Sequence, residues 1–120
     1  MDEHDYGRIC SIKAYCEDAL DLMNRFGRSI DDFTDKKEYY YSISMIIYQI
    51  GELSGGLSDE FKEETKNEIP WTLIRGMRNR FAHTYDRMNK ADIWDTMVQD
   101  VPVLYEFCEK MTKKQESARP

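Results

Sequence analysis

Several features that would place this chain in a familiar protein class are scarce or missing. Its 120 residues include only three cysteines and no Cys-x-x-Cys pair, so the sequence shows neither a zinc-site pattern nor an even-numbered disulfide framework. No apolar run approaches the roughly 18 residues that mark a membrane span. The first five residues are acidic and do not resemble a signal peptide. We therefore expect a cytoplasmic protein.

Sustained alternation of apolar and polar residues is also missing, so no β-strand is predicted. Apolar residues instead recur at steps of three and four, which is typical of amphipathic helices. The pattern predicts helices over residues 5–26, 36–57 and 89–111, a short helical turn over 59–66, and a further helix that opens at 69–71. That last helix carries four apolar residues on its core-facing side, Leu73, Ile74, Met77 and Phe81.

The predicted helices are separated by residues that typically end or begin a helix. Gly27 should stop the first helix, and residues 29–35 read as a polar connector. Asn89 is a suitable N-cap, and Pro102 should kink or split the helix that Asn89 opens. We expect an all-α protein, an antiparallel bundle of four or five helices. It should form one domain over residues 1–120, with its core at about 5–113 and a frayed tail over 115–120.

Charge is unevenly distributed along the chain. The net charge is −6, which argues against wholesale coating of nucleic acid. Residues 75–90, however, hold five basic residues and one acid, so this window carries +4 while the remainder carries −10. A basic island on an acidic body suits local recognition of an anion or docking onto an acidic partner.

One of the only two histidines lies inside this basic stretch. Four residues separate Arg78 from His83, and Tyr85 follows shortly after. Histidine exchanges a proton near neutral pH, and arginine binds phosphate without losing its charge. The combination points to chemistry on a phosphodiester.

Metal-free RNA cleavage needs a group that moves the 2′-hydroxyl proton and a cation that stabilises the charged phosphorane. His83 suits the first role and Arg78 the second. No acidic cluster has the spacing of a two-metal site, so we expect neither a metal nor a cofactor. The supporting candidates are Arg75 and Arg80 as further phosphate ligands, Asn79 as a residue that orients the His83 ring, and Tyr85 as a hydrogen-bond donor or base-stacking group.

On an ideal helix, Arg78 lies about 140° from His83, so the two do not share a face. They could meet if the helix ends near His83, if Arg78 reaches around on its long stem, or if two subunits each supply one of them. The small residues Gly76 and Ala82 would let a partner helix approach, which favours a homodimer. An alternative with equal weight is that Gly76 only relieves steric crowding within one chain.

The chain resembles the HepT-like branch of the HEPN superfamily, which consists of small all-α bacterial and archaeal proteins. The resemblance covers roughly residues 5–113 and includes the Arg-x4-His-x-Tyr signature. The motifs that carry it are Ile50-Gly51-Glu52-Leu53, Ile69-Pro70-Trp71, residues 74–85, Ile93-Trp94 and Asp100-Val101-Pro102. Gly55-Gly56 departs from the helix-favouring residues that relatives carry there.

This resemblance implies the toxin half of a toxin–antitoxin pair: a homodimeric, metal-independent endoribonuclease. The family's catalytic residues correspond to Arg78, Asn79 and His83. The implied partner is a minimal nucleotidyltransferase of the MNT type, which neutralises the toxin by transferring AMP from ATP to Tyr85. Glu52 becomes a candidate charge partner for an arginine, with a structural ion pair favoured over a role in the site.

Two other functions fit the same residues. The first is a non-catalytic homodimer that binds nucleotide, RNA or a partner protein and acts with a nucleotidyltransferase. The second is a purely structural dimer in which Arg78 and His83 hold the interface.

Overall fold

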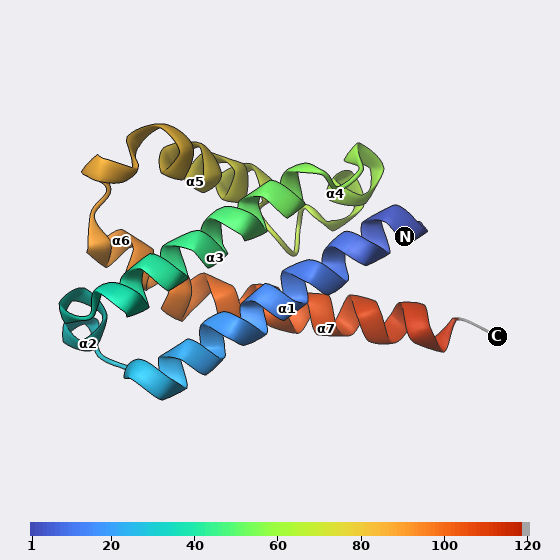
Figure 1. Ribbon diagram of the computed structural model, residues 1–120. Coiled ribbons are helices and arrows are strands. Elements are labelled where there is room, and N and C mark those ends of the chain that lie inside the picture. Colours follow the sequence, from blue (N-terminus) through green and yellow to red (C-terminus); the bar gives the residue numbers. More distant parts are fainter. Residues whose placement is uncertain (119–120) are drawn as a thin grey trace.

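Among residues 1–118, four long helices build the protein and alternate in direction along the chain (Figure 1). The computed structural model describes residues 1–118. Within that range there is no strand, and the prediction of an all-α bundle is confirmed. α1 packs against both α3 and α7, and α3 also packs against α5. The long helices are α1 (Glu3–Phe26), α3 (Lys37–Gly55), α5 (Trp71–Thr84) and α7 (Val101–Ser117).

The first helix ends where the sequence predicts. Asp2 caps its start by accepting a hydrogen bond from the Asp5 amide at 2.7 Å. Gly27 ends it with a φ of 126°, a conformation that glycine adopts without a steric penalty. The predicted connector over 29–35 is wrong, because residues 30–35 form the short helix α2 (Ile30–Asp35). Ser29 caps α2, and Phe33 anchors it in the core.

The helix predicted over 89–111 is split, as expected near Pro102. Asn89 caps α6 (Lys90–Asp95) by accepting from the Ala91 amide at 2.7 Å. A π-helical turn, η2 (Thr96–Asp100), then leads into α7. Since proline has no N–H to donate, a change of hydrogen-bonding pattern just before Pro102 is a natural place for the break. The tail predicted over 115–120 is wrong for 115–117, which continue α7, and residues 119–120 lie outside the described residues.

α4 (Asp59–Thr65) is tied to both neighbouring helices by buried polar contacts. The carboxylate of Asp5, which is 2% exposed, accepts from the Ser58 amide at 2.8 Å and from the Ser58 hydroxyl at 2.6 Å. On the other side, the Trp71 indole donates to the Thr65 hydroxyl at 2.8 Å. Buried groups that satisfy one another in this way fix the position of α4 relative to α1 and α5.

α5 is the least buried of the long helices. Only Trp71 and Phe81 are buried, and the helix packs mainly against α3. The prediction that Leu73 faces the core is wrong, because its side chain is 71% exposed. Most of the circumference of α5, including much of the basic stretch, therefore faces outward.

The contact between α3 and α5 depends on a glycine. A Cβ atom at Gly51 would lie 2.5 Å from the Cβ of Arg78 and 3.4 Å from its Cα. Those atoms belong to the start of the side chain and to the backbone, so they cannot rotate away. Gly51 thus lets α3 approach α5 directly beneath Arg78.

Within residues 1–118, no helix combines the length and the apolar character needed to cross a bilayer.

We predict that Gly51→Ala destabilises the protein by about 1–2 kcal/mol, because overpacking outweighs the better helix propensity of alanine. Urea denaturation measures the change. Gly55→Ala is the matched control, since a Cβ there meets nothing within 4 Å, and it should be neutral or stabilising by up to about 1 kcal/mol. Equal stability of the two variants would contradict the close contact.

Candidate active site

Two residues of α3, one carboxylate and one aromatic ring, hold the side chain of Arg78, which lies on α5. Its Nε donates to the carboxylate of Glu52, one helical turn before the end of α3. Its guanidinium also lies over the Tyr48 ring, 5.7 Å from the centroid. Glu52 raises the pKa of Arg78 further above its ordinary value, so the guanidinium stays charged throughout the accessible pH range.

The same guanidinium reaches toward the polar side of α5. Its Nη1 donates to the Asn79 side-chain oxygen at 3.1 Å. The Arg78 side chain is 32% exposed, and a guanidinium has five N–H groups, so donors are left for an anionic ligand. The Asn79 oxygen accepts from Arg78, and no hydrogen bond among the described residues joins Asn79 to His83. Glu52, Arg78 and Asn79 form one connected set.

His83 lies in the last turn of α5 with its side chain exposed. No hydrogen bond or ion pair among the described residues joins it to Arg78 or to any other side chain. Because α5 is continuous through Thr84, the two residues keep their separation of about 140° around the helix. The imidazole is therefore free to meet a substrate or a second protein.

The two other arginines have different surroundings. Arg80 pairs with Asp92 of α6 at 3.4 Å, in an exposed contact of small energetic value. Arg75 is exposed and has no acidic partner among residues 1–118. Arg75 is thus the better placed of the two to bind an anion.

Tyr85 is shielded in this conformation. It begins the 3₁₀ turn η1 (Tyr85–Arg87) and stacks on Phe81, with ring centroids 5.8 Å apart. Its hydroxyl is buried and has no hydrogen-bond partner among residues 1–118. The Tyr40 hydroxyl is nearby without meeting the geometry of a hydrogen bond to Tyr85, and burial together with the Tyr85 and Tyr41 hydroxyls raises the pKa of Tyr40 above its ordinary value. Base stacking by Tyr85 would require this turn to move.

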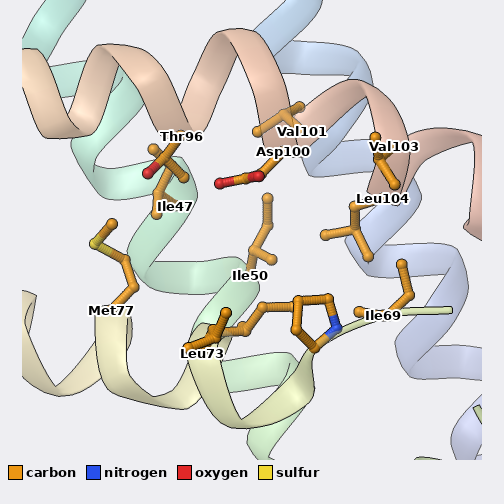
Figure 2. A pocket seen from close by; sticks show the side chains of 12 residues that line it. Ile47, Ile50, Ile69, Leu73, Met77, Thr96, Asp100, Val101, Val103 and Leu104 are labelled. Carbon is orange, nitrogen blue, oxygen red and sulfur yellow. The ribbon is translucent and has the colours of Figure 1, made fainter. Parts of the chain in front are cut away.

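The outward face of α5 adjoins an apolar groove of about 240 Å³ between α3, α5 and α7 (Figure 2). Leu73 and Met77 form one side of this groove, and Val103, which is 54% exposed, lies on the other. The carboxylate of Asp100 lies at the same groove, and burial raises its pKa. Gly76 lies beside it on α5, and a Cβ there would meet nothing within 4 Å. The alternative that Gly76 relieves crowding within one chain is therefore wrong.

Sequence reasoning missed two residues of the site. Tyr48 lies one helical turn before Glu52 on α3, and this i, i+4 spacing is the signal that would have placed it beside Arg78. Gly51 was noticed only as part of a motif, whereas its role depends on how closely α3 and α5 approach. Among the described residues, no group of three or more His, Cys, Asp or Glu side chains is arranged to hold a metal ion.

Comparisons with known proteins agree on one family. Residues 12–111 match the family model described as "Ribonuclease HepT-like". A protein from Thermococcus cleftensis named "Probable ribonuclease HepT" is 32% identical over 108 residues, covering 86% of this chain and 97% of that protein. A Methanocaldococcus jannaschii protein with a provisional RNase name is 30% identical over 96 residues, covering 76% of this chain and 87% of its own length. No solved structure is a significant match.

We predict that Tyr85→Phe stabilises the protein by about 1 kcal/mol, since it keeps the stacking on Phe81 and removes a buried hydroxyl without a partner. The melting temperature should rise by about 4 °C. Tyr41→Phe is the control, because Tyr41 is 53% exposed and so loses no deeply buried hydroxyl. A Tyr85→Phe protein less stable than wild type would show that the hydroxyl makes a stabilising hydrogen bond.

Proposed function

We propose that this chain, which belongs to the HepT-like ribonuclease family, is an endoribonuclease that cleaves RNA without a metal ion. The observation that supports this most is the arrangement on α5. A permanently charged guanidinium is anchored by Glu52 and Asn79, and an exposed imidazole follows within the same helix. The chain's own side chains thus offer both the proton-transfer group and the phosphate ligand that the reaction needs.

The chemistry follows from these roles. His83 takes the proton from a ribose 2′-hydroxyl, and the 2′-oxygen attacks the adjacent phosphorus. The bond from phosphorus to the 5′-oxygen breaks, and His83 returns the proton to the departing oxygen. The products are a 2′,3′-cyclic phosphate and a 5′-hydroxyl. Arg78 neutralises the charge that builds up on the phosphorane oxygens.

The active unit is a homodimer in which Arg78 of one protomer and His83 of its partner act on the same phosphate. Three features of α5 support this arrangement. Gly76 leaves room for a partner helix, Leu73 exposes apolar surface beside the groove, and His83 lies on the same outward side. Within one chain, α5 buries little apolar surface. Burying the apolar groove against a second copy would add hydrophobic stabilisation to α5.

Regulation falls to a nucleotidyltransferase antitoxin that transfers AMP from ATP to the Tyr85 hydroxyl and releases pyrophosphate. Because the Tyr85 hydroxyl is buried, the transfer requires the turn at residues 84–88 to open first. The attached phosphate would then compete with RNA for Arg78 and block access to His83. In this account the protein is the toxin of the pair.

We predict that purified protein cleaves a mixed RNA pool in excess EDTA and that His83→Ala is slower by about 10²–10⁴-fold, the usual contribution of an acid–base group. Intact mass first establishes that Tyr85 carries no AMP. His4→Gln is the control, since it removes the only other histidine, at the far end of the bundle from His83. If unmodified wild type cleaves RNA no faster than His83→Ala, the proposal is overturned, and a non-catalytic RNA-binding dimer is favoured.

We also predict that Gly76→Gln breaks the dimer while leaving each protomer folded. The side chain meets nothing within its own chain and improves helix propensity by up to about 1 kcal/mol, but it fills the space reserved for the partner helix. Molar mass from light scattering measures the outcome. Gly7→Gln on α1 is the control, because a Cβ there is equally free of contacts. A Gly76→Gln protein as dimeric as Gly7→Gln would place the interface elsewhere.

A further inference from the structure

A second concave site lies at the opposite end of α5 from His83. It is a cleft of about 540 Å³ between the end of α3, α4 and the first turns of α5, and we refer to it as the basic cleft. The buried contacts of Asp5 with Ser58 and of Trp71 with Thr65 hold its walls in place, so the cleft is preformed. Its lining residues are Ser54, Gly55, Asp59, Lys62, Glu63, Lys66, Pro70, Trp71, Thr72 and Arg75.

The charges in the basic cleft are only partly balanced. Lys66 pairs with Glu63, and these two charges offset each other. Asp59 lies in the first turn of α4, where it interacts favourably with the helix dipole and keeps its negative charge. Lys62 and Arg75 have no acidic partner among the described residues. The five charged residues of the lining sum to +1, and the two cations that make no ion pair, together with the Thr72 hydroxyl, suit phosphate.

The basic cleft is continuous with the proposed active site. Thr72, Arg75, Asn79 and His83 follow one another at spacings of three and four, so they line one exposed face of α5 within an arc of about 80°. Arg75 lies about 12 Å from His83 along the helix axis. On the scale of a B-form strand, which advances about 3.4 Å per nucleotide, the two positions are separated by roughly three to four nucleotides.

We propose that the basic cleft binds a backbone phosphate of the RNA on one side of the cleaved bond, with Lys62 and Arg75 as its ligands. This inference rests on the proposed ribonuclease function and extends it. The RNA strand follows the polar face of α5 from His83 to α4. Trp71, the aromatic residue in the lining, is only 7% exposed and offers no platform for a base. The cleft therefore adds affinity for longer RNA without reading its sequence.

The test measures RNA affinity in the full-length His83→Ala protein, which binds without cutting. A dinucleotide should occupy only the active site, whereas a single strand of about 12 nucleotides should also reach the cleft. Adding Lys62→Gln should weaken binding of the long strand roughly tenfold and lower the salt dependence of its binding constant by about 0.7 in log–log slope. Lys114→Gln, an exposed lysine on α7 outside the cleft, is the control and should change neither.

Thr72→Asp separates lost binding from lost folding. The first turn of α5 contains no acidic residue, so an aspartate there interacts favourably with the helix dipole and should maintain or raise stability. The same carboxylate repels phosphate in the cleft and should weaken binding of the long strand. A stable Thr72→Asp protein with reduced affinity for long RNA supports the proposal.

The cleft proposal is overturned if the Lys62→Gln and Thr72→Asp proteins bind long RNA as tightly as Lys114→Gln does. That outcome would count against the cleft even if wild type cleaves RNA in EDTA. Conversely, a wild type that cuts nothing, with affinity for long RNA that still depends on Lys62, would confirm the cleft and overturn the ribonuclease proposal. The two proposals can therefore fail separately.

Discussion

The close approach of α3 to α5 is the constraint on which the site depends. Only glycine fits at position 51, because any side chain there would clash with Arg78. One residue further along α3, Glu52 pairs with the Arg78 guanidinium, and Tyr48 lies beneath it. A single helix contact therefore removes a steric barrier, supplies a counter-charge and orients the cation. An arginine held in this way loses less conformational entropy on binding phosphate than a free one, since much of that cost is met during folding.

The same arrangement explains why so much of the surface of α5 stays exposed in one chain. It packs mainly against α3, so it presents an apolar edge at Leu73, an unobstructed glycine at Gly76 and a free imidazole at His83. These features suit different ligands. The apolar edge and the glycine suit a second copy of the chain, and the polar face between His83 and the basic cleft suits an RNA strand. The buried hydroxyl of Tyr85 adds a third property, because a modifying enzyme would reach it only after η1 opens.

Local sequence patterns predicted most of the fold, and contacts between helices account for what they missed. The period of the apolar residues, Gly27 and the Asn89 cap located the long helices because each of these signals acts within one or two turns. Helix α2 was missed because it is only six residues long and depends on one serine cap and one buried phenylalanine. Leu73 was misplaced because periodicity identifies an apolar face without showing what covers it. The sequence predicted Glu52 as a charge partner for an arginine without identifying which one. Its pairing with Arg78 and the contribution of Tyr48 depend on the register of α3 against α5, which no single helix encodes.

In the proposed active site, Arg78 comes from one protomer and His83 from the other. The most direct measurement is RNA cleavage by mixed dimers of Arg78→Ala and His83→Ala, each first shown to be folded, dimeric and inactive alone. Random mixing gives about half heterodimers, each with one intact shared site, so activity near a quarter of wild type is expected. A mixture as inactive as either variant alone would contradict the claim and place both residues of each site within one chain.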